Sequence, residues 1–214
     1  MSAITRDQFL DALRRSILAG GHRAAEALSA VPGDPAAMWA GCLRGDILLW
    51  LASWAGVDRR LVVGATCAAV RPALGYIPQG EDRPRLAIEA AEAWARGEEG
   101  VTVDSVGGSE QAAYAAWVAL RASTRSNPSA MAASAAAQYA ALAAFRDSAA
   151  VDAVAAAADV ASADPALAVL FAGAADALAR GLVRTAYMAA VADCVRTQIP
   201  WPVVEAVLTE RGIA

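Results

Sequence analysis

Histidine chemistry has a single candidate in this sequence, because His22 is the only histidine. It follows two glycines near the start of the chain and has no obvious triad partner beside it. Sites with several histidines are therefore excluded, and Cys42, Cys67 and Cys194 lie too far apart for a CxxC pair that would indicate zinc. The motifs of phosphate-binding loops and serine nucleophiles are missing as well. We expect no catalytic residue, no metal ion and no cofactor.

Isolated aspartates are further candidates for chemistry, and they interrupt apolar stretches in the second half of the chain, at Asp147, Asp152, Asp159, Asp176 and Asp193. Asp152 and Asp159 are seven residues apart and would share one face of a helix. Carboxylates gathered inside a helical bundle can bind a metal or act as acid and base. A lone aspartate in an alanine-rich helix more commonly marks the solvent side, and we adopt that interpretation.

A short glycine motif is another candidate. Gly107, Gly108 and Ser109 precede a predicted helix, where backbone N–H groups can bind an anion. Adjacent glycines are more typical of a flexible loop. We therefore interpret residues 100–109 as a loop with at most one turn of helix.

The stretch from Glu81 to Glu99 combines charge with strong helix signals. Asp82 is placed to cap a helix that begins at Pro84, and Gly97 is placed to end it. Charged residues at spacings of three and four form one stripe with two i, i+4 pairs, namely Arg85, Glu89, Glu92 and Arg96. Because the rest of the helix surface is apolar, we expect this helix to lie at the centre of the core.

Acidic residues flank this charged helix on both sides. Glu81 and Asp82 precede it, where negative charge suits the helix dipole. Glu98 and Glu99 follow it, where negative charge is unfavourable, so helix stability does not account for them. We predict that these four acidic residues bind a partner.

The elements that position these residues are helices. More than a quarter of the chain is alanine and 57% is hydrophobic, while only 6% is aromatic, which favours closely packed helices. We predict a single all-α domain, an antiparallel bundle of about eight to ten helices. Residues 1–44 form an N-terminal helical extension and residues 45–214 the alanine-rich helical domain. The expected helices cover 5–18, 35–54 with a break near 41–45, 59–70, 84–96, 109–124, 128–146, 148–162, 165–180, 182–198 and 202–211, and a short additional one is expected around 23–29.

Charge and hydropathy narrow the classes of partner. The net charge of −4 and pI of about 5.0 argue against nucleic acid, since phosphate contacts need a basic face. The same charge permits a basic protein partner. We expect no membrane span and no signal peptide, and the scattered cysteines fit a reducing cytoplasm.

Three stretches carry a resemblance to a known family. They are GDILLWLASWAGVDRRLVV from Gly45, GEDRPRLAIEAAEAWARGE over 80–98, and ADCVRTQIPWPVVEAVL over 192–208. Together with the alanine-rich middle they resemble a family of bacterial helical proteins described as immunity proteins of polymorphic-toxin systems. The resemblance covers about three quarters of the chain and implies a helical protein that neutralises a cognate toxin. It brings no catalytic or binding residues with it.

We therefore expect a non-enzymatic cytoplasmic protein that binds another protein, with a toxin neutralised by occlusion as the leading case. One alternative is a structural or adaptor module that forms a homo-oligomer or joins a larger assembly through an exposed Ala/Leu-rich helix face. The other is a bundle that binds a small molecule with buried carboxylates and Trp50 or Trp54. That alternative predicts a closed apolar pocket with an aspartate pointing inward.

Overall fold

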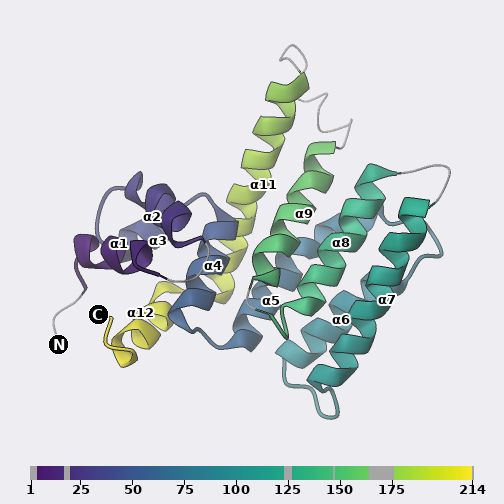
Figure 1. The fold of residues 1–214 in the computed structure, drawn as a ribbon, viewed down its shortest axis with the longest axis horizontal. Coiled ribbons are helices and arrows are strands. Elements are labelled where there is room, and N and C mark those ends of the chain that lie inside the picture. The colour runs from purple at the N-terminus through teal and green to yellow at the C-terminus, as the bar shows by residue number, and fades with distance from the viewer. Residues whose placement is uncertain (1–3, 17–19, 123–126, 147, 164–175, 214) are drawn as a thin grey trace.

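The computed structural model describes residues 4–16, 20–122, 127–146, 148–163 and 176–213 (Figure 1). Within these residues the chain forms eleven α-helices and one 3₁₀ helix, and no strand. The all-α prediction is confirmed. Helices that follow one another through short connections pack as antiparallel neighbours, as α6 with α7 and α8 with α9 do.

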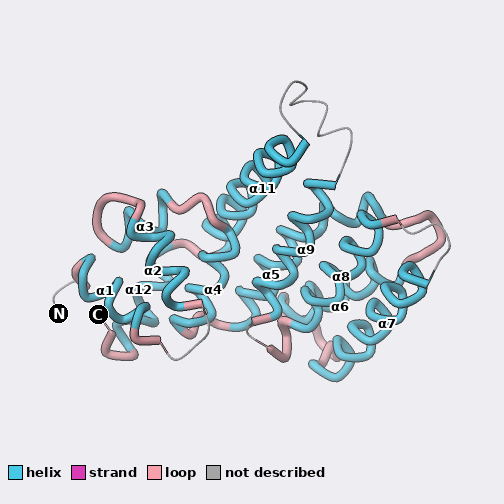
Figure 2. Tube along the Cα trace, turned by 45° about the horizontal axis from the view of Figure 1, so that its top comes forward, coloured by secondary structure: helices cyan, strands magenta, loops and turns pink. Residues whose placement is uncertain are grey.

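The N-terminal helices gather at one end of the molecule with the last helix (Figures 1 and 2). These helices are α1 (Arg6–Arg14), α2 (Gly21–Ser29), α3 (Pro35–Gly41) and α12 (Trp201–Glu210). Local signals define their starts: Thr5 forms a capping box with Gln8, and the Asp34 carboxylate accepts from the backbone N–H of Ala37. Both α2 and α12 contact α4, so this end is joined to the rest of the bundle.

The remaining helices form the body of the bundle. They are α4 (Gly45–Ala55), α5 (Arg59–Val70), the 3₁₀ helix η1 (Arg71–Tyr76), α6 (Arg83–Ala95), α7 (Val103–Ala122), α8 (Pro128–Leu142), α9 (Ala149–Ala163) and α11 (Asp176–Gln198). In Figure 1, α11, α9, α8 and α7 lie side by side, and α7 is at the edge opposite the N-terminal helices. Since α5 contacts α4, α6, α8, α9 and α11, it occupies the central position.

Alanine explains how closely these helices pack. The buried residues of α8 are six alanines and Ser134, and α8 lies against both α7 and α9. Small side chains let the helix axes approach, which compensates for the scarcity of large core residues. The Ser134 hydroxyl is buried but donates a 3.1 Å hydrogen bond to the carbonyl of Ala113. The contact between α7 and α8 therefore provides the hydrogen-bond partner that this buried hydroxyl needs.

The charged helix α6 lies on a flank of the core, contrary to the expectation that it is central. It packs against α5, α7 and α8, and buries a single face. Leu86 and Arg85 stay exposed on the other side. Asp82 makes no side-chain cap, so that expectation is wrong, whereas Gly97 ends the helix in the left-handed conformation at φ +71° as predicted.

Two other predictions based on glycine, both of helix boundaries, are wrong. Helix α7 already begins at Val103, so Gly107 and Gly108 lie inside a helix and do not form the predicted loop or an anion-binding start. Helix α11 runs through Gly181, where the sequence predicts a boundary between two helices. The predicted helix over 165–180 falls largely outside the described residues.

Candidate functional site

The structure does not bring the four acidic residues around α6 together. Glu81 and Asp82 precede this helix of 13 residues and Glu98 and Glu99 follow it, which separates the two pairs by about 20 Å. Three of them have arginine partners in their own segment, at 2.7 Å for Glu81 with Arg83, 3.2 Å for Asp82 with Arg85 and 2.7 Å for Glu98 with Arg96. Glu99 is exposed and forms no ion pair with a described residue.

These ion pairs alter the electrostatics of the acidic residues. The hydrogen bond from Arg83 lowers the pKa of the Glu81 carboxyl, so this residue stays ionised. Glu92 of the charged stripe pairs across the bundle with Arg71 of η1, while Arg85 and Glu89 form the predicted i, i+4 pair at 2.8 Å. The arginines offset much of the negative charge around α6. Of the four acidic residues, Glu99 is the one whose charge no arginine partner in the described part of the chain offsets.

The predicted aspartates do not form a metal or acid–base cluster. Asp152 is exposed, Asp159 pairs with Arg184, and Asp193 pairs with Arg196 at the surface. Asp147 lies outside the described residues, and the side chain of Asp176 does so too. Among the residues that the structure describes, no group of three or more His, Cys, Asp or Glu side chains could hold a metal ion.

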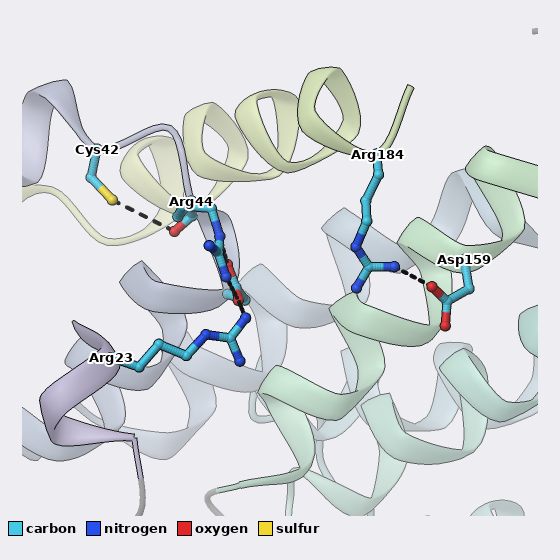
Figure 3. Close-up of polar contacts among 6 residues, drawn as sticks. Arg23, Cys42, Arg44, Asp159 and Arg184 are labelled. Carbon is cyan, nitrogen blue, oxygen red and sulfur yellow. Dashed lines mark hydrogen bonds and ion pairs between the residues drawn. The ribbon is translucent and has the colours of Figure 1, made fainter. Parts of the chain in front are cut away.

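Asp46, which the sequence reasoning missed, is the one buried carboxylate among the residues that the structure describes. Only 3% of its surface is exposed. Arg44 donates to it through Nε at 2.8 Å and Nη2 at 2.6 Å, and Arg23 of α2 donates through Nη2 at 3.1 Å. Figure 3 shows the arginine side chains converging from two different elements. The hydrogen bonds that Arg44 donates to the Asp46 carboxylate raise the pKa of the Arg44 guanidinium.

A cavity of about 430 Å³ lies beside this cluster. It is lined by Gly20, Arg23, Asp46, Ile47, Trp50, Ser53, Trp54, Ser148, Val151 and Asp152. Trp50 and Trp54 stack on each other within α4, with ring centroids 6.1 Å apart and planes 11° apart. Asp152 of α9 lies on the opposite wall of the cavity. The cavity is open toward solvent at the exposed Arg23 and Asp152, so it is not the closed pocket of the small-molecule alternative, although an aspartate does face it.

Gly20 fixes one wall of this cavity. Its backbone has φ +108°, and a Cβ built there would lie 2.8 Å from Nε1 of Trp50. Only glycine therefore allows the chain to pass so close to the indole ring. The turn before α2 therefore passes directly beside the Trp50 ring of α4.

An aromatic face on α7 is the second feature that sequence reasoning missed. Tyr114 stacks on Trp117 with centroids 5.7 Å apart, and the Arg121 guanidinium lies 5.4 Å from the Trp117 ring centroid. Tyr114 is 49% exposed, and Val118 beside it is 45% exposed. We call Tyr114, Trp117, Val118 and Arg121 the α7 face. Their spacing of three and four residues is the signal that could have revealed it.

The single histidine and the cysteines offer little chemistry. His22 is exposed near the start of α2. Burial raises the pKa of the Cys67 thiol strongly, and burial also raises the pKa values of Cys42 and Cys194. A thiol with a raised pKa has little of the nucleophilic thiolate at neutral pH. These cysteines therefore behave as small core residues.

Comparison with protein-family models, with curated proteins and with solved structures finds no match to this chain. In the described part of the chain, no helix combines the length and the apolar character needed to cross a membrane.

Proposed function

We propose that this chain is a non-enzymatic protein that binds another protein and, in line with the resemblance of its sequence, neutralises a cognate toxin by covering its active surface. The observation that supports this proposal is the exposed α7 face. Tyrosine, tryptophan and arginine are the residues that contribute most binding energy at protein interfaces. Here they are stacked on one another before any partner arrives, which lowers the entropy lost on binding.

Two of the four acidic residues around α6 lie near the α7 face. Because α6 and α7 are antiparallel neighbours, the start of α6 lies beside the second half of α7. Glu81 and Asp82 are thus at the same end of the helix pair as the α7 face, whereas Glu98 and Glu99 are at the other end. The net charge of −4 favours a basic partner, while Arg83 and Arg85 offset much of the negative charge of Glu81 and Asp82 at this end.

The proposal is tested by identifying the partner. The tagged chain is purified gently from its native host, and stoichiometric companions are identified by mass spectrometry. Expression of the companion alone should arrest growth, and co-expression of this chain should restore it. Recovery of the chain alone would contradict the proposal, and recovery only with itself would instead support the self-associating adaptor.

Variants locate the binding surface. The double substitution Tyr114→Ala with Trp117→Ala should weaken binding of the identified partner at least about thirtyfold, the loss expected from a pair of central aromatic residues. Leu182→Ala, which removes an exposed apolar side chain of α11, is the matched control and should leave affinity unchanged. Lysine substitutions at Glu81, Asp82, Glu98 and Glu99 should slow the association of a basic partner. Equal affinity in all variants would exclude this surface.

We infer small-molecule binding as a second candidate function from the cavity between α4 and α9. Its volume of about 430 Å³ is that of a typical ligand pocket, and two stacked indole rings with a carboxylate opposite suit a planar ligand. Native mass spectrometry of the gently purified chain should then reveal a bound small molecule. Val151→Trp, which fills the cavity, should abolish that added mass, and a wild-type spectrum without it would count against this candidate.

A further inference from the structure

A second cavity, of about 410 Å³, lies on another side of the Asp46 cluster. It is lined by Arg23, Leu43, Arg44, Arg184, Thr185 and Met188. Three arginines thus face it, and no aspartate or glutamate of the described residues lines it. In a chain with net charge −4 this concentration of positive charge is unusual. We call this cavity the arginine pocket.

The arginines come from separate segments and are held in place by ion pairs. Arg23 belongs to α2, Arg44 precedes α4 and Arg184 belongs to α11. Asp46 anchors the first two, and Asp159 of α9 anchors Arg184 across the gap (Figure 3). Ion pairs of this kind fix guanidinium groups in position, which removes part of the entropy cost of binding a ligand.

The anchoring contacts leave donors available. A guanidinium has five N–H donors. Arg23 uses Nη2 for Asp46, Arg184 uses Nη1 for Asp159, and Arg44 uses Nε and Nη2 for Asp46. The three side chains are 40–63% exposed, so the other nitrogens are accessible.

The charges of the cluster leave an excess of positive charge. Three arginines and the two anchoring aspartates, Asp46 and Asp159, sum to one positive charge, and neither aspartate lines the pocket. The charged side chains among the described residues of the pocket wall are therefore all positive. Arginine pairs with phosphate and carboxylate through two parallel hydrogen bonds, which makes oxyanions the fitting ligands.

We propose that the arginine pocket binds a small polyanion, whose phosphate or carboxylate groups accept hydrogen bonds from Arg23, Arg44 and Arg184. The volume suits a small organic molecule rather than a polypeptide segment. The side chains of buried Met188 and of Leu43 form an apolar part of the wall, which can contact the carbon skeleton of the ligand. This proposal is independent of the protein-binding function, since α7 lies at a different place in the bundle (Figure 1).

The test is isothermal titration calorimetry of the full chain with inorganic pyrophosphate and, separately, with citrate at low ionic strength. One or both should bind saturably with 1:1 stoichiometry, and the tighter of the two identifies phosphate or carboxylate as the preferred group. Added salt should weaken the binding, because the charges are partly exposed. No binding of either anion at up to about 10 mM would overturn the proposal.

Two arginine variants make the test specific. Arg184→Gln should weaken anion binding by about tenfold, the effect of losing one charge-assisted contact. Arg85→Gln removes an equally exposed, ion-paired arginine on α6 and should leave binding unchanged. Arg184→Lys keeps the charge without the paired donors and should fall between wild type and Arg184→Gln. Affinity that is the same in wild type and Arg184→Gln would overturn the assignment of the pocket, and circular dichroism checks that each variant is folded.

Discussion

At the scale of single residues, Asp46 links α2 to the start of α4 through one buried carboxylate. Asp46→Asn keeps its shape but removes the charge that Arg44 and Arg23 bind. We expect the free energy of unfolding to fall by about 1–3 kcal/mol, because charge-assisted hydrogen bonds of a buried group are lost. Urea denaturation followed by circular dichroism measures this change.

The matched control for Asp46 is an aspartate whose ion pair is exposed. Asp11 pairs with Arg14 at 2.9 Å on the surface of α1. Since exposed pairs contribute little, Asp11→Asn should change the free energy of unfolding by less than about 0.5 kcal/mol. Similar losses in the two variants would show that burial of Asp46 adds nothing to its stabilising effect.

The cysteine thiols give a second prediction at this scale. Burial raises the pKa of Cys67 most and leaves that side chain inaccessible, whereas Cys194 is half-buried. Iodoacetamide at about pH 8 should therefore modify Cys194 first and Cys67 only after unfolding. Raising the pH should speed the reaction of Cys194, because more of its thiol becomes thiolate. Peptide mass spectrometry follows each site, and early modification of Cys67 in the folded protein would contradict this order.

At the scale of helices, α4 and α11 meet at a contact that only glycine permits. A Cβ at Gly45 would lie 2.3 Å from Cγ1 of Val191 and 2.9 Å from the backbone nitrogen of Ala192. Gly45→Ala should therefore push the two helices apart and lower the free energy of unfolding by about 1–3 kcal/mol. A thermal denaturation midpoint equal to that of wild type would show that the contact is looser than described.

Gly108 is the matched control, because it lies inside α7 and a Cβ there would have no atom of another helix within 4 Å. Gly108→Ala should raise the free energy of unfolding by about 0.5–1 kcal/mol, since alanine favours the helix and glycine does not. The same variant tests the start of α7. A gain in stability fits the helical conformation of residue 108 in the structure, whereas a loop glycine that needs a positive φ would be destabilised by alanine.

Helix starts could be predicted where the signal is local. Asp34 with Pro35 and Asn127 with Pro128 combine a cap and a proline within two residues, and both mark real starts. The predicted helix boundary at Gly181 is wrong because one glycine destabilises a long helix by only about 1 kcal/mol. Packing of α11 against α4, α5 and α9 offsets this destabilisation. Asp46 was missed because its burial depends on α2, which is distant in sequence.

At the scale of the whole molecule, the N-terminal segment is built into the end of the bundle. Phe9 of α1 is fully buried and meets the rings of Trp54 and Trp201 edge-on, at centroid distances of 6.4 and 6.2 Å. Trp39 of α3 packs against Trp201 as well, at 6.2 Å. The sequence predicts residues 1–44 as an extension because no local pattern shows that the first and last helices meet.

Arg196 adds a polar connection between the two ends of the chain. Its Nη1 donates to the carbonyl of Trp39 at 3.3 Å and to that of Cys42 at 2.8 Å. Deleting residues 1–44 would therefore uncover Trp201 and Trp54 and leave Arg196 without these acceptors. The deletion also removes Arg23 and Arg44, so Asp46 would be left without its described cationic partners.

We accordingly expect the full chain to unfold in one cooperative transition and the chain from residue 45 onward to lose that transition. Phe9→Ala probes the same interface with less damage and should lower the free energy of unfolding by about 3–5 kcal/mol, the cost of emptying a buried aromatic site. Phe145→Ala, at a phenylalanine that is 39% exposed, should cost clearly less. Differential scanning calorimetry distinguishes the outcomes. A deleted chain that still melts cooperatively near the wild-type midpoint would show that residues 45–214 fold alone and that the N-terminal helices only cover them.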